Sequence, residues 1–170
     1  MKSIYRRAIL TVALVSGTAC GVHAGESATL LAGAETYNLK VAIYTDPGCA
    51  IDQAALTALA QRQFGKAPKL RSVSEQAIPD IILTLTVDIT AVPPSELPEM
   101  CLYNVNARAI HPMYGKLRYS DRTRVIQAMT FSKSMFSAII PSKAQMAVEI
   151  QSGKVLGMFL DEYALGNPYP

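Results

Sequence analysis

The chain has 170 residues, of which 50% are hydrophobic and 17% are charged. This length suits one domain with a substantial buried core, and the low charge excludes an intrinsically disordered protein. The formal net charge is +3, but Lys2, Arg6 and Arg7 account for it. Residues 25–170 carry 13 basic and 13 acidic side chains, so overall charge gives no reason to expect nucleic acid as a partner.

Residues 1–24 show the three zones of a secretory signal peptide. Met1–Arg7 is basic, Ala8–Val15 is an apolar run, and Ser16–Ala24 is small and polar. A membrane span needs roughly 20 apolar residues, so this run is too short to serve as an anchor. We therefore expect cleavage after Ala24 and a periplasmic or secreted protein with no transmembrane segment.

Lipidation at Cys20 is the alternative reading of the same segment. An exported bacterial lipoprotein begins at an acylated cysteine that follows small residues. Here Gly17 stands where such signals usually carry Leu, which counts against a lipid anchor. The two readings predict different first residues of the processed chain, Gly25 and Cys20.

Cleavage after Ala24 would leave two cysteines, Cys49 and Cys101. In an oxidising compartment such a pair typically forms a disulfide. Neither cysteine lies in a C-x-x-C motif, and His111 is the single histidine after Ala24. A structural zinc site needs four nitrogen or sulfur ligands, so we predict a structural disulfide, no metal and no cofactor.

The first predicted elements after the signal are a strand and a helix. Residues 25–36 lack a pattern and are expected to form a flexible lead-in. Residues 37–44 alternate between apolar and polar side chains, as a half-buried strand does. Asp46 is a candidate helix cap, with Pro47 in the first turn. Apolar residues at helical spacing then predict a helix over 51–64.

Residues 69–74 are a weak strand candidate. Three clearer strands follow and are expected to form an antiparallel meander. The first, residues 81–91, alternates in a way that indicates which face is buried. Residues 101–111 alternate again, with Cys101 on the inward face. A third strand is expected near 122–131, and 132–140 read as irregular.

The last predicted helix runs from about Pro141 to Leu165, ended by Gly166 and Pro168. Gly153 and Gly157 lie within it, although each glycine disfavours a helix interior by about 1 kcal/mol. Their spacing permits two readings, a smooth strip that lets the helix approach the sheet or a break into two helices. The sequence leaves this open.

These elements have the order β-α-β-β-β-β-α. They predict an α+β fold, a two-layer sandwich whose mainly antiparallel sheet carries helices on one face. No repeat or linker divides the chain, so residues 37–168 are expected to form a single domain.

Familiar catalytic motifs are missing from the sequence. It holds no G-x-S-x-G, S-x-x-K, H-E-x-x-H, P-loop or G-x-G-x-x-G pattern. His111 remains a candidate lone base, but its place at a strand end before Pro112 favours an ordinary edge histidine. Four carboxylates are spread over different elements with no spacing typical of a hydrolase, namely Asp46, Asp52, Asp80 and Asp88. We assign no catalytic residue and expect a protein that is not an enzyme.

One local cluster has the composition of a binding site. Basic side chains are interleaved with a tyrosine, a combination that binds phosphate, carboxylated sugar or an acidic protein patch. The alternative is a solvated hairpin whose charges protect a sheet edge from aggregation. The residues are Lys116, Arg118, Tyr119, Arg122 and Arg124.

The overall pattern resembles that of small secreted proteins of Gram-negative bacteria. The residues that carry this loose resemblance are Gly48-Cys49, Cys101, Asp161-Glu162-Tyr163 and Asn167-Pro168. The resemblance implies export and no particular activity. The strand–helix–meander–helix order is also similar to that of periplasmic docking modules, which is an analogy of fold.

Three functional hypotheses follow from the sequence. The first is a non-enzymatic periplasmic protein that binds another envelope component through a sheet edge or the basic hairpin. The second is a small-ligand carrier or sensor with a pocket between the sheet and the last helix, near Met129 and Met158. The third is a hydrolase that uses His111 with a distant acid. The oligomeric state cannot be predicted.

Overall fold

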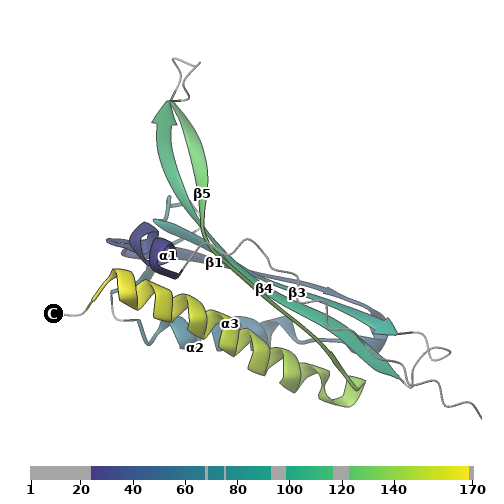
Figure 1. The fold of residues 1–170 in the computed structure, drawn as a ribbon. Coiled ribbons are helices and arrows are strands. Elements are labelled where there is room, and N and C mark those ends of the chain that lie inside the picture. Colours follow the sequence, from purple (N-terminus) through teal and green to yellow (C-terminus); the bar gives the residue numbers. More distant parts are fainter. Residues whose placement is uncertain (1–23, 68, 75, 93–98, 117–122, 169–170) are drawn as a thin grey trace, which may run out of the picture.

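The protein is a two-layer α+β sandwich, as the sequence predicts (Figure 1). The computed structural model describes residues 24–67, 69–74, 76–92, 99–116 and 123–168. Its helices are α1 (Ala24–Leu31), α2 (Gln53–Phe64) and α3 (Ala144–Gly166), with single 3₁₀ turns at Pro47–Cys49 and Pro141–Lys143. Its strands are β1 (Thr36–Thr45), β2 (Arg71–Ser72), β3 (Ile81–Val92), β4 (Met100–Lys116) and β5 (Thr123–Ile139).

The five strands form one sheet with the order β2-β1-β3-β4-β5. Strand β1 is parallel to both β2 and β3, because α2 makes the crossover between β1 and the β2–β3 region. Strands β3, β4 and β5 form the predicted antiparallel meander. The helices lie on the same side of this sheet (Figure 1).

The core lies between the sheet and the helices, and period-two alternation builds its sheet side. Five β3 residues from Ile81 to Ile89 are buried, as are five β4 residues from Cys101 to Ala109. An aromatic chain then joins the layers: Tyr37 stacks on Phe64 at 4.6 Å between ring centroids, and Phe64 contacts Phe159 at 5.7 Å. Phe131 of β5 meets Phe159 edge-on at 5.4 Å.

Helix α3 is continuous, which decides between the two readings of its glycines. Its buried face includes Val148, Val155 and Phe159, which pack toward the sheet. A side chain at Gly153 would be in ordinary contact with Gln63, and one at Gly157 would meet open space. These glycines therefore do not mediate a close approach to the sheet.

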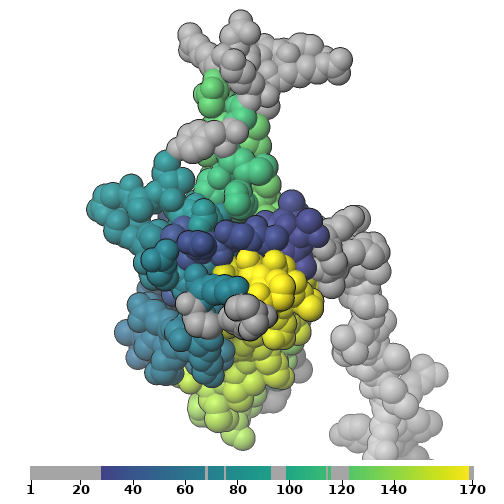
Figure 2. Space-filling model, turned by 90° about the vertical axis from the view of Figure 1, so that its left-hand side faces the viewer, coloured from purple at the N-terminus to yellow at the C-terminus, as the bar shows by residue number. Residues whose placement is uncertain are grey.

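Residues 25–36 differ from the predicted flexible lead-in, because they contain most of α1 and the start of β1. Helix α1 packs on the end of α3, and a Cβ at Gly166 would collide with the carbonyl oxygen of Ala28. Figure 2 shows this N-terminal segment against the end of α3. The sequence of residues 25–35 carries no strong helical pattern, and the helix depends on this tertiary contact.

Asn167 and Tyr163 hold the turn between α1 and β1 in place. Asn167 Nδ2 donates to the Leu31 carbonyl at 2.8 Å, and its Oδ1 accepts from the Gly33 N–H at 2.7 Å. The Tyr163 hydroxyl donates to the Ala34 carbonyl at 2.8 Å. Part of the Tyr163 and Asn167 pattern noted in the sequence thus has a structural role.

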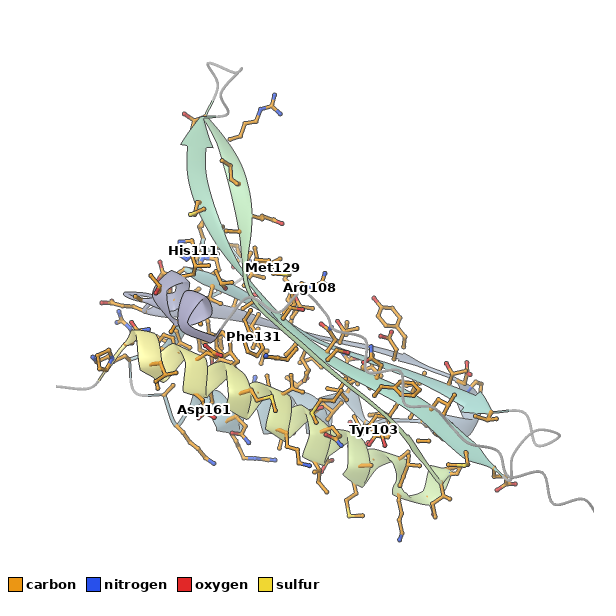
Figure 3. The ribbon with its side chains drawn as sticks, viewed as in Figure 1. Tyr103, Arg108, His111, Met129, Phe131 and Asp161 are labelled. Atoms are coloured by element: carbon orange, nitrogen blue, oxygen red, sulfur yellow. A yellow bond between two sulfur atoms is a disulfide. The ribbon has the colours of Figure 1, made fainter. Side chains whose placement is uncertain are left out.

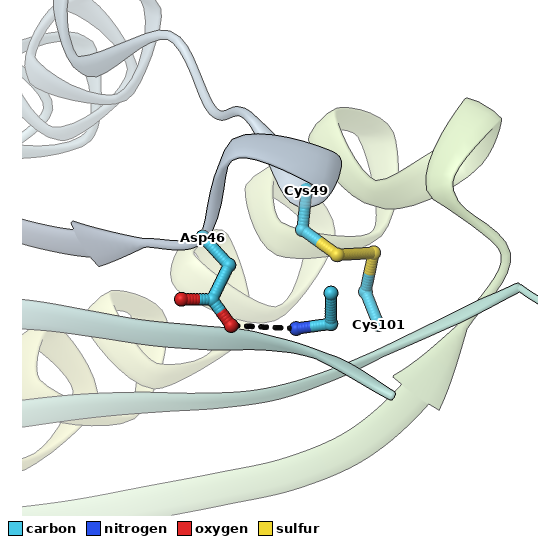
Figure 4. The surroundings of a disulfide bond; sticks show 4 residues. Asp46, Cys49 and Cys101 are labelled. Carbon is cyan, nitrogen blue, oxygen red and sulfur yellow. Dashed lines mark hydrogen bonds between the residues drawn. A yellow bond between two sulfur atoms is a disulfide. The ribbon is translucent and has the colours of Figure 1, made fainter. Parts of the chain in front are cut away.

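Two local predictions are wrong. Asp46 makes no capping hydrogen bond; its Oδ2 instead accepts from the Ala91 N–H at 3.0 Å, which ties the end of β1 to β3 (Figure 4). Asp52 caps α2, accepting from the N–H groups of Ala54 and Ala55. Residues 132–140 are not irregular, because β5 continues to Ile139 by pairing with β4.

The predicted disulfide between Cys49 and Cys101 is present (Figure 4). It joins the 3₁₀ turn before α2 to the start of β4, and both cysteines are buried. The bridge closes a separation of 52 residues. It therefore connects the helical layer to the meander near the end of β3.

We expect replacement of Cys49 and Cys101 by serine to lower the free energy of unfolding by about 4 kcal/mol, because the unfolded chain regains loop entropy. Urea denaturation of the oxidised protein and the double variant measures this difference. Reduced wild-type protein is the control and should match the variant. Equal midpoints for oxidised and reduced wild type would contradict a stabilising bridge.

Candidate functional site

The sheet face that points away from the helices, here called the open face, carries its side chains in transverse rows. Strand register places Tyr44 beside Asp88, Asp88 beside Asn104, and Asn104 beside Phe136. The two rows that follow toward the start of β1 are Ala42, Thr86, Asn106 and Ser134, and then Lys40, Thr84, Arg108 and Ser132.

Two exposed aromatic side chains mark the ends of the first row. Tyr44 is 64% exposed and Phe136 is 70% exposed, although large apolar side chains are normally covered. Their strands are three interstrand spacings apart, about 14 Å. Between them lie a carboxylate and an amide, Asp88 and Asn104.

A polar groove of about 380 Å³ runs along the middle of the open face. In Figure 3 Arg108 lies on this side of the sheet, whereas Phe131 lies on the side of α3. Asp88 and Arg108 both line the groove, and neither forms an ion pair with a residue that the structure describes. The remaining lining residues are Thr84, Thr86, Asn104, Asn106 and Ile110.

A cleft of about 350 Å³ lies next to the groove, where the segment before β3 borders the open face. Its walls are mainly apolar, including Ile78 and Val125, with Lys40 beside them. Asn38 also lines this cleft and is 9% exposed. Its amide nitrogen donates to the Val73 carbonyl, but its buried Oδ1 has no hydrogen-bond partner among the described residues.

Strands β4 and β5 continue beyond the rest of the sheet as a two-stranded ribbon, here called the hairpin arm (residues 111–116 and 123–129; Figures 1 and 2). The register of β4 and β5 shifts between Ala109 and Ile110, and Thr130 is the extra residue. Such a bulge bends a strand and increases its twist. Pro112, which lacks an N–H, lies past Ile110, the last β4 residue with a partner on β3.

Apolar side chains of the hairpin arm are exposed. Val125 is 55% exposed and Met129 is 51% exposed, and Met113 is also exposed. A Cβ at Gly115 would lie 2.7 Å from Ile126 Cδ1, so the glycine leaves room for that side chain across the ribbon. The arm therefore exposes apolar side chains beside the polar residues Thr123, Arg124 and Gln127.

Two residues of the predicted basic cluster, Lys116 and Arg124, lie near the outer end of the hairpin arm. Lys116 ends β4 and pairs with Thr123, and the exposed Arg124 pairs with Gly115. The structure thus brings two members of the cluster to neighbouring strands. Arg118, Tyr119 and Arg122 lie outside the described residues, so a binding role for the cluster stays a prediction.

His111 lies near Asp80, but the described residues form no nucleophile–base pair around it. His111 is half-buried, and its Nδ1 has no hydrogen-bond partner in the described part of the chain. The hydroxyl beside Asp80 belongs to Thr36, which donates to Asp80 Oδ2 at 2.7 Å and not to the imidazole. An activated hydroxyl would need to donate to the base, so this geometry does not favour the hydrolase hypothesis.

Asp80 connects the starts of β1 and β3. Its Oδ2 accepts from the Glu35 and Thr36 N–H groups at 3.0 and 2.9 Å, and the Asp80 N–H donates to Thr36 Oγ1 at 2.9 Å. Burial acts to raise the pKa of Asp80, but these hydrogen bonds and the neighbouring His111 outweigh it and lower the pKa below its ordinary value.

The ligand pocket predicted between the sheet and α3 is not supported. Val155, Leu156 and Phe159 are fully buried there. Met129 and Met158, predicted to line that pocket, are instead exposed. The groove and the cleft described above lie on the opposite face.

Within the described ranges, no three side chains of His, Cys, Asp or Glu come together as metal ligands would. No helix in the described part of the chain is long and apolar enough to cross a membrane.

Comparison with known proteins gives only loose structural similarity. No protein-family model matches the sequence, and no curated protein matches it. A PelC dodecamer from Paraburkholderia phytofirmans is similar with a TM-score of 0.44 and 13% identity, over 72% of this chain and 86% of that chain. Hypothetical protein CT253 from Chlamydia trachomatis has a TM-score of 0.41 and 9% identity, over 77% and 94%. Rare lipoprotein B from Shewanella oneidensis has a TM-score of 0.31 and 10% identity, over 75% of this chain and 93% of that chain. Similarity at this level assigns no family or function.

The sequence prediction missed the open face as a site. Alternation identified the outward residues of β1, β3 and β4, including Asn104 and Arg108, but not which of them are neighbours. That depends on register between strands up to 92 residues apart, such as Tyr44 on β1 and Phe136 on β5. The unusual signal within the sequence was an aromatic residue at an outward position of β1 and of β5.

Substitution of Asp80 by alanine should lower the free energy of unfolding by about 1–3 kcal/mol, because it removes the charged acceptor of the Glu35 and Thr36 N–H groups. Asp80→Asn keeps an acceptor oxygen but no charge, and should lose less. The lowered pKa means that the wild type keeps the charge-dependent stability above about pH 4, the ordinary Asp pKa, and loses it as pH falls through the folded-state pKa.

Thermal unfolding measured between pH 2 and pH 7 tests both effects. The difference in melting temperature between wild type and Asp80→Asn should narrow at the acidic end. A difference that stays constant across this range would show that the Asp80 charge does not stabilise the fold.

Proposed function

We propose that the protein is an exported, non-enzymatic docking module that binds another protein of the cell envelope through the hairpin arm. Support for export comes from the signal-like residues 1–24 and from the Cys49–Cys101 disulfide, a bond that persists in oxidising compartments. The hairpin arm carries the docking proposal.

Without a partner, the hairpin arm exposes apolar surface on a ribbon of low intrinsic stability. A two-stranded hairpin by itself is marginally stable in water, and exposed apolar patches typically mark contact surfaces. Here Val125 and Met129 are exposed on one face of such a ribbon, and Met113 is exposed on the other. A partner that covered these side chains would stabilise the arm and bury its apolar surface.

The outer edge of β5 can extend the same contact. Strand β5 has 17 residues and is the last strand in the order of the described sheet. An edge strand offers its backbone N–H and C=O groups to an incoming strand. The basic residues Lys116 and Arg124 at the tip favour a partner whose contacting surface is acidic.

Polar substitution of Val125 and Met129 to serine should abolish the complex, because it removes the apolar contact. A matched control is available on α3, where Met146 and Ile150 are 55% and 51% exposed, the same values as Val125 and Met129. Native mass spectrometry of protein recovered from an envelope extract measures the bound chain. Wild type and the Met146→Ser, Ile150→Ser control should retain it.

Charge reversal tests the tip separately. Arg122→Glu combined with Arg124→Glu should weaken the complex and remove its dependence on salt. The mass of the bound chain distinguishes another protein from a second copy of this one. A lone wild-type chain, or a complex that survives in the Val125→Ser, Met129→Ser variant, would refute docking through the arm.

A further inference from the structure

We infer that the open face binds an acidic oligosaccharide, a sugar chain whose units carry carboxylates. The groove on this face is lined by none of the apolar side chains that carry the docking proposal, although Val125 lines the neighbouring cleft. The ligand class follows from three properties of the face: exposed rings at its borders, mixed hydrogen-bonding groups between them, and two cations in one row.

The rings of Tyr44 and Phe136 border the first row on β1 and β5. Both are exposed, so each offers a flat apolar surface to a ligand lying on the sheet. The C–H faces of pyranose rings are apolar and stack on aromatic rings. The separation of about 14 Å between the two strands matches the length of a short sugar chain laid across them.

The groove between the rings presents both donors and acceptors. Asn104 and Asn106 supply amides, Thr84 and Thr86 supply hydroxyls, and Asp88 accepts only. Vicinal sugar hydroxyls donate and accept at the same time, and such a mixed surface suits them. Ser134 Oγ donates to Asn104 Oδ1 at 2.5 Å, which fixes the orientation of that amide and leaves its N–H₂ group to the groove.

Charge identifies the kind of sugar. Lys40 and Arg108 flank Thr84 in the third row, where two cations can meet a carboxylate. Asp88 lies four residues after Thr84 on β3, about 13 Å from it, where it can accept hydrogen bonds from hydroxyls. A polyphosphate chain would bring negative charge to Asp88 as well, and an extended peptide would pair with a sheet edge.

The cleft beside the third row supplies a further unmet contact. Asn38 lies two residues before Lys40 on the same face of β1, and its buried Oδ1 lacks a donor among the described residues. Asn38 and Lys40 line this cleft together. A hydroxyl of a sugar unit held by Lys40 could donate to that oxygen.

Isothermal titration of the full-length secreted protein with hexamers of galacturonic acid and of mannuronic acid tests the inference. We expect one of them to bind, with affinity that falls as salt rises. Tyr44→Ala, Phe136→Ala and Arg108→Gln should each weaken binding about tenfold or more. Matched controls are Leu165→Ala, an apolar side chain 70% exposed on α3, and Arg62→Gln, an exposed arginine on α2.

Absence of binding of both acidic hexamers at millimolar concentration would overturn the site. Equal binding of a neutral glucose hexamer would overturn the assignment to acidic sugars. Binding that is unchanged in Tyr44→Ala and Phe136→Ala would place the sugar elsewhere. Met113→Ser changes an exposed apolar side chain of the arm that lines neither the groove nor the cleft, so this variant should weaken docking and keep its sugar affinity, and failure of the docking proposal and failure of this one are distinguishable.

Discussion

The register of β1, β3 and β4 is the constraint on which the other features depend. Side chains alternate between the two faces of a strand, so a slip of one residue would exchange the core residues of β3 with its polar ones. Three contacts oppose such a slip. Asp80 joins the starts of β1 and β3, Asp46 joins the end of β1 to Ala91, and the disulfide joins the following turn to β4.

The same register has opposite consequences on the two faces. On the inner face it stacks Leu83, Leu85 and Val87 against the helices, where burial of apolar surface stabilises the fold. On the open face it aligns Tyr44, Asp88, Asn104 and Phe136 in one row, where no helix covers them. The polar row contributes little to the core, so its alignment is free to serve binding.

The elements with strong periodicity were predicted correctly from sequence, namely the strands over 37–44, 81–91 and 101–111 and the helix over 51–64. Each has a local pattern that its tertiary contacts reinforce. Helix α1 was missed because its stability comes from Gly166 and Asn167, more than 130 residues away. The second half of β5 was missed because its pairing with β4, rather than its own pattern, keeps it extended.

The candidate surfaces were less predictable than the fold, because they too depend on contacts between residues far apart in the sequence. The basic residues near the arm tip are close in sequence, so composition alone drew attention to them. The projection of the arm was not predictable from sequence. It requires β4 to continue past Ile110, where its pairing with β3 ends, and β5 to form a bulge at Thr130.

The neutral overall charge of residues 25–170 conceals charges that are separated on the open face. Residues 25–170 are neutral overall, yet Lys40 and Arg108 share one row of the open face and Asp88 stands two rows away. Ion pairing between Asp88 and Arg108 would cancel both charges, and the row that lies between them prevents it. Separated charges on a rigid sheet cost little in water, because solvent screens them, and they remain available to a ligand that spans both rows.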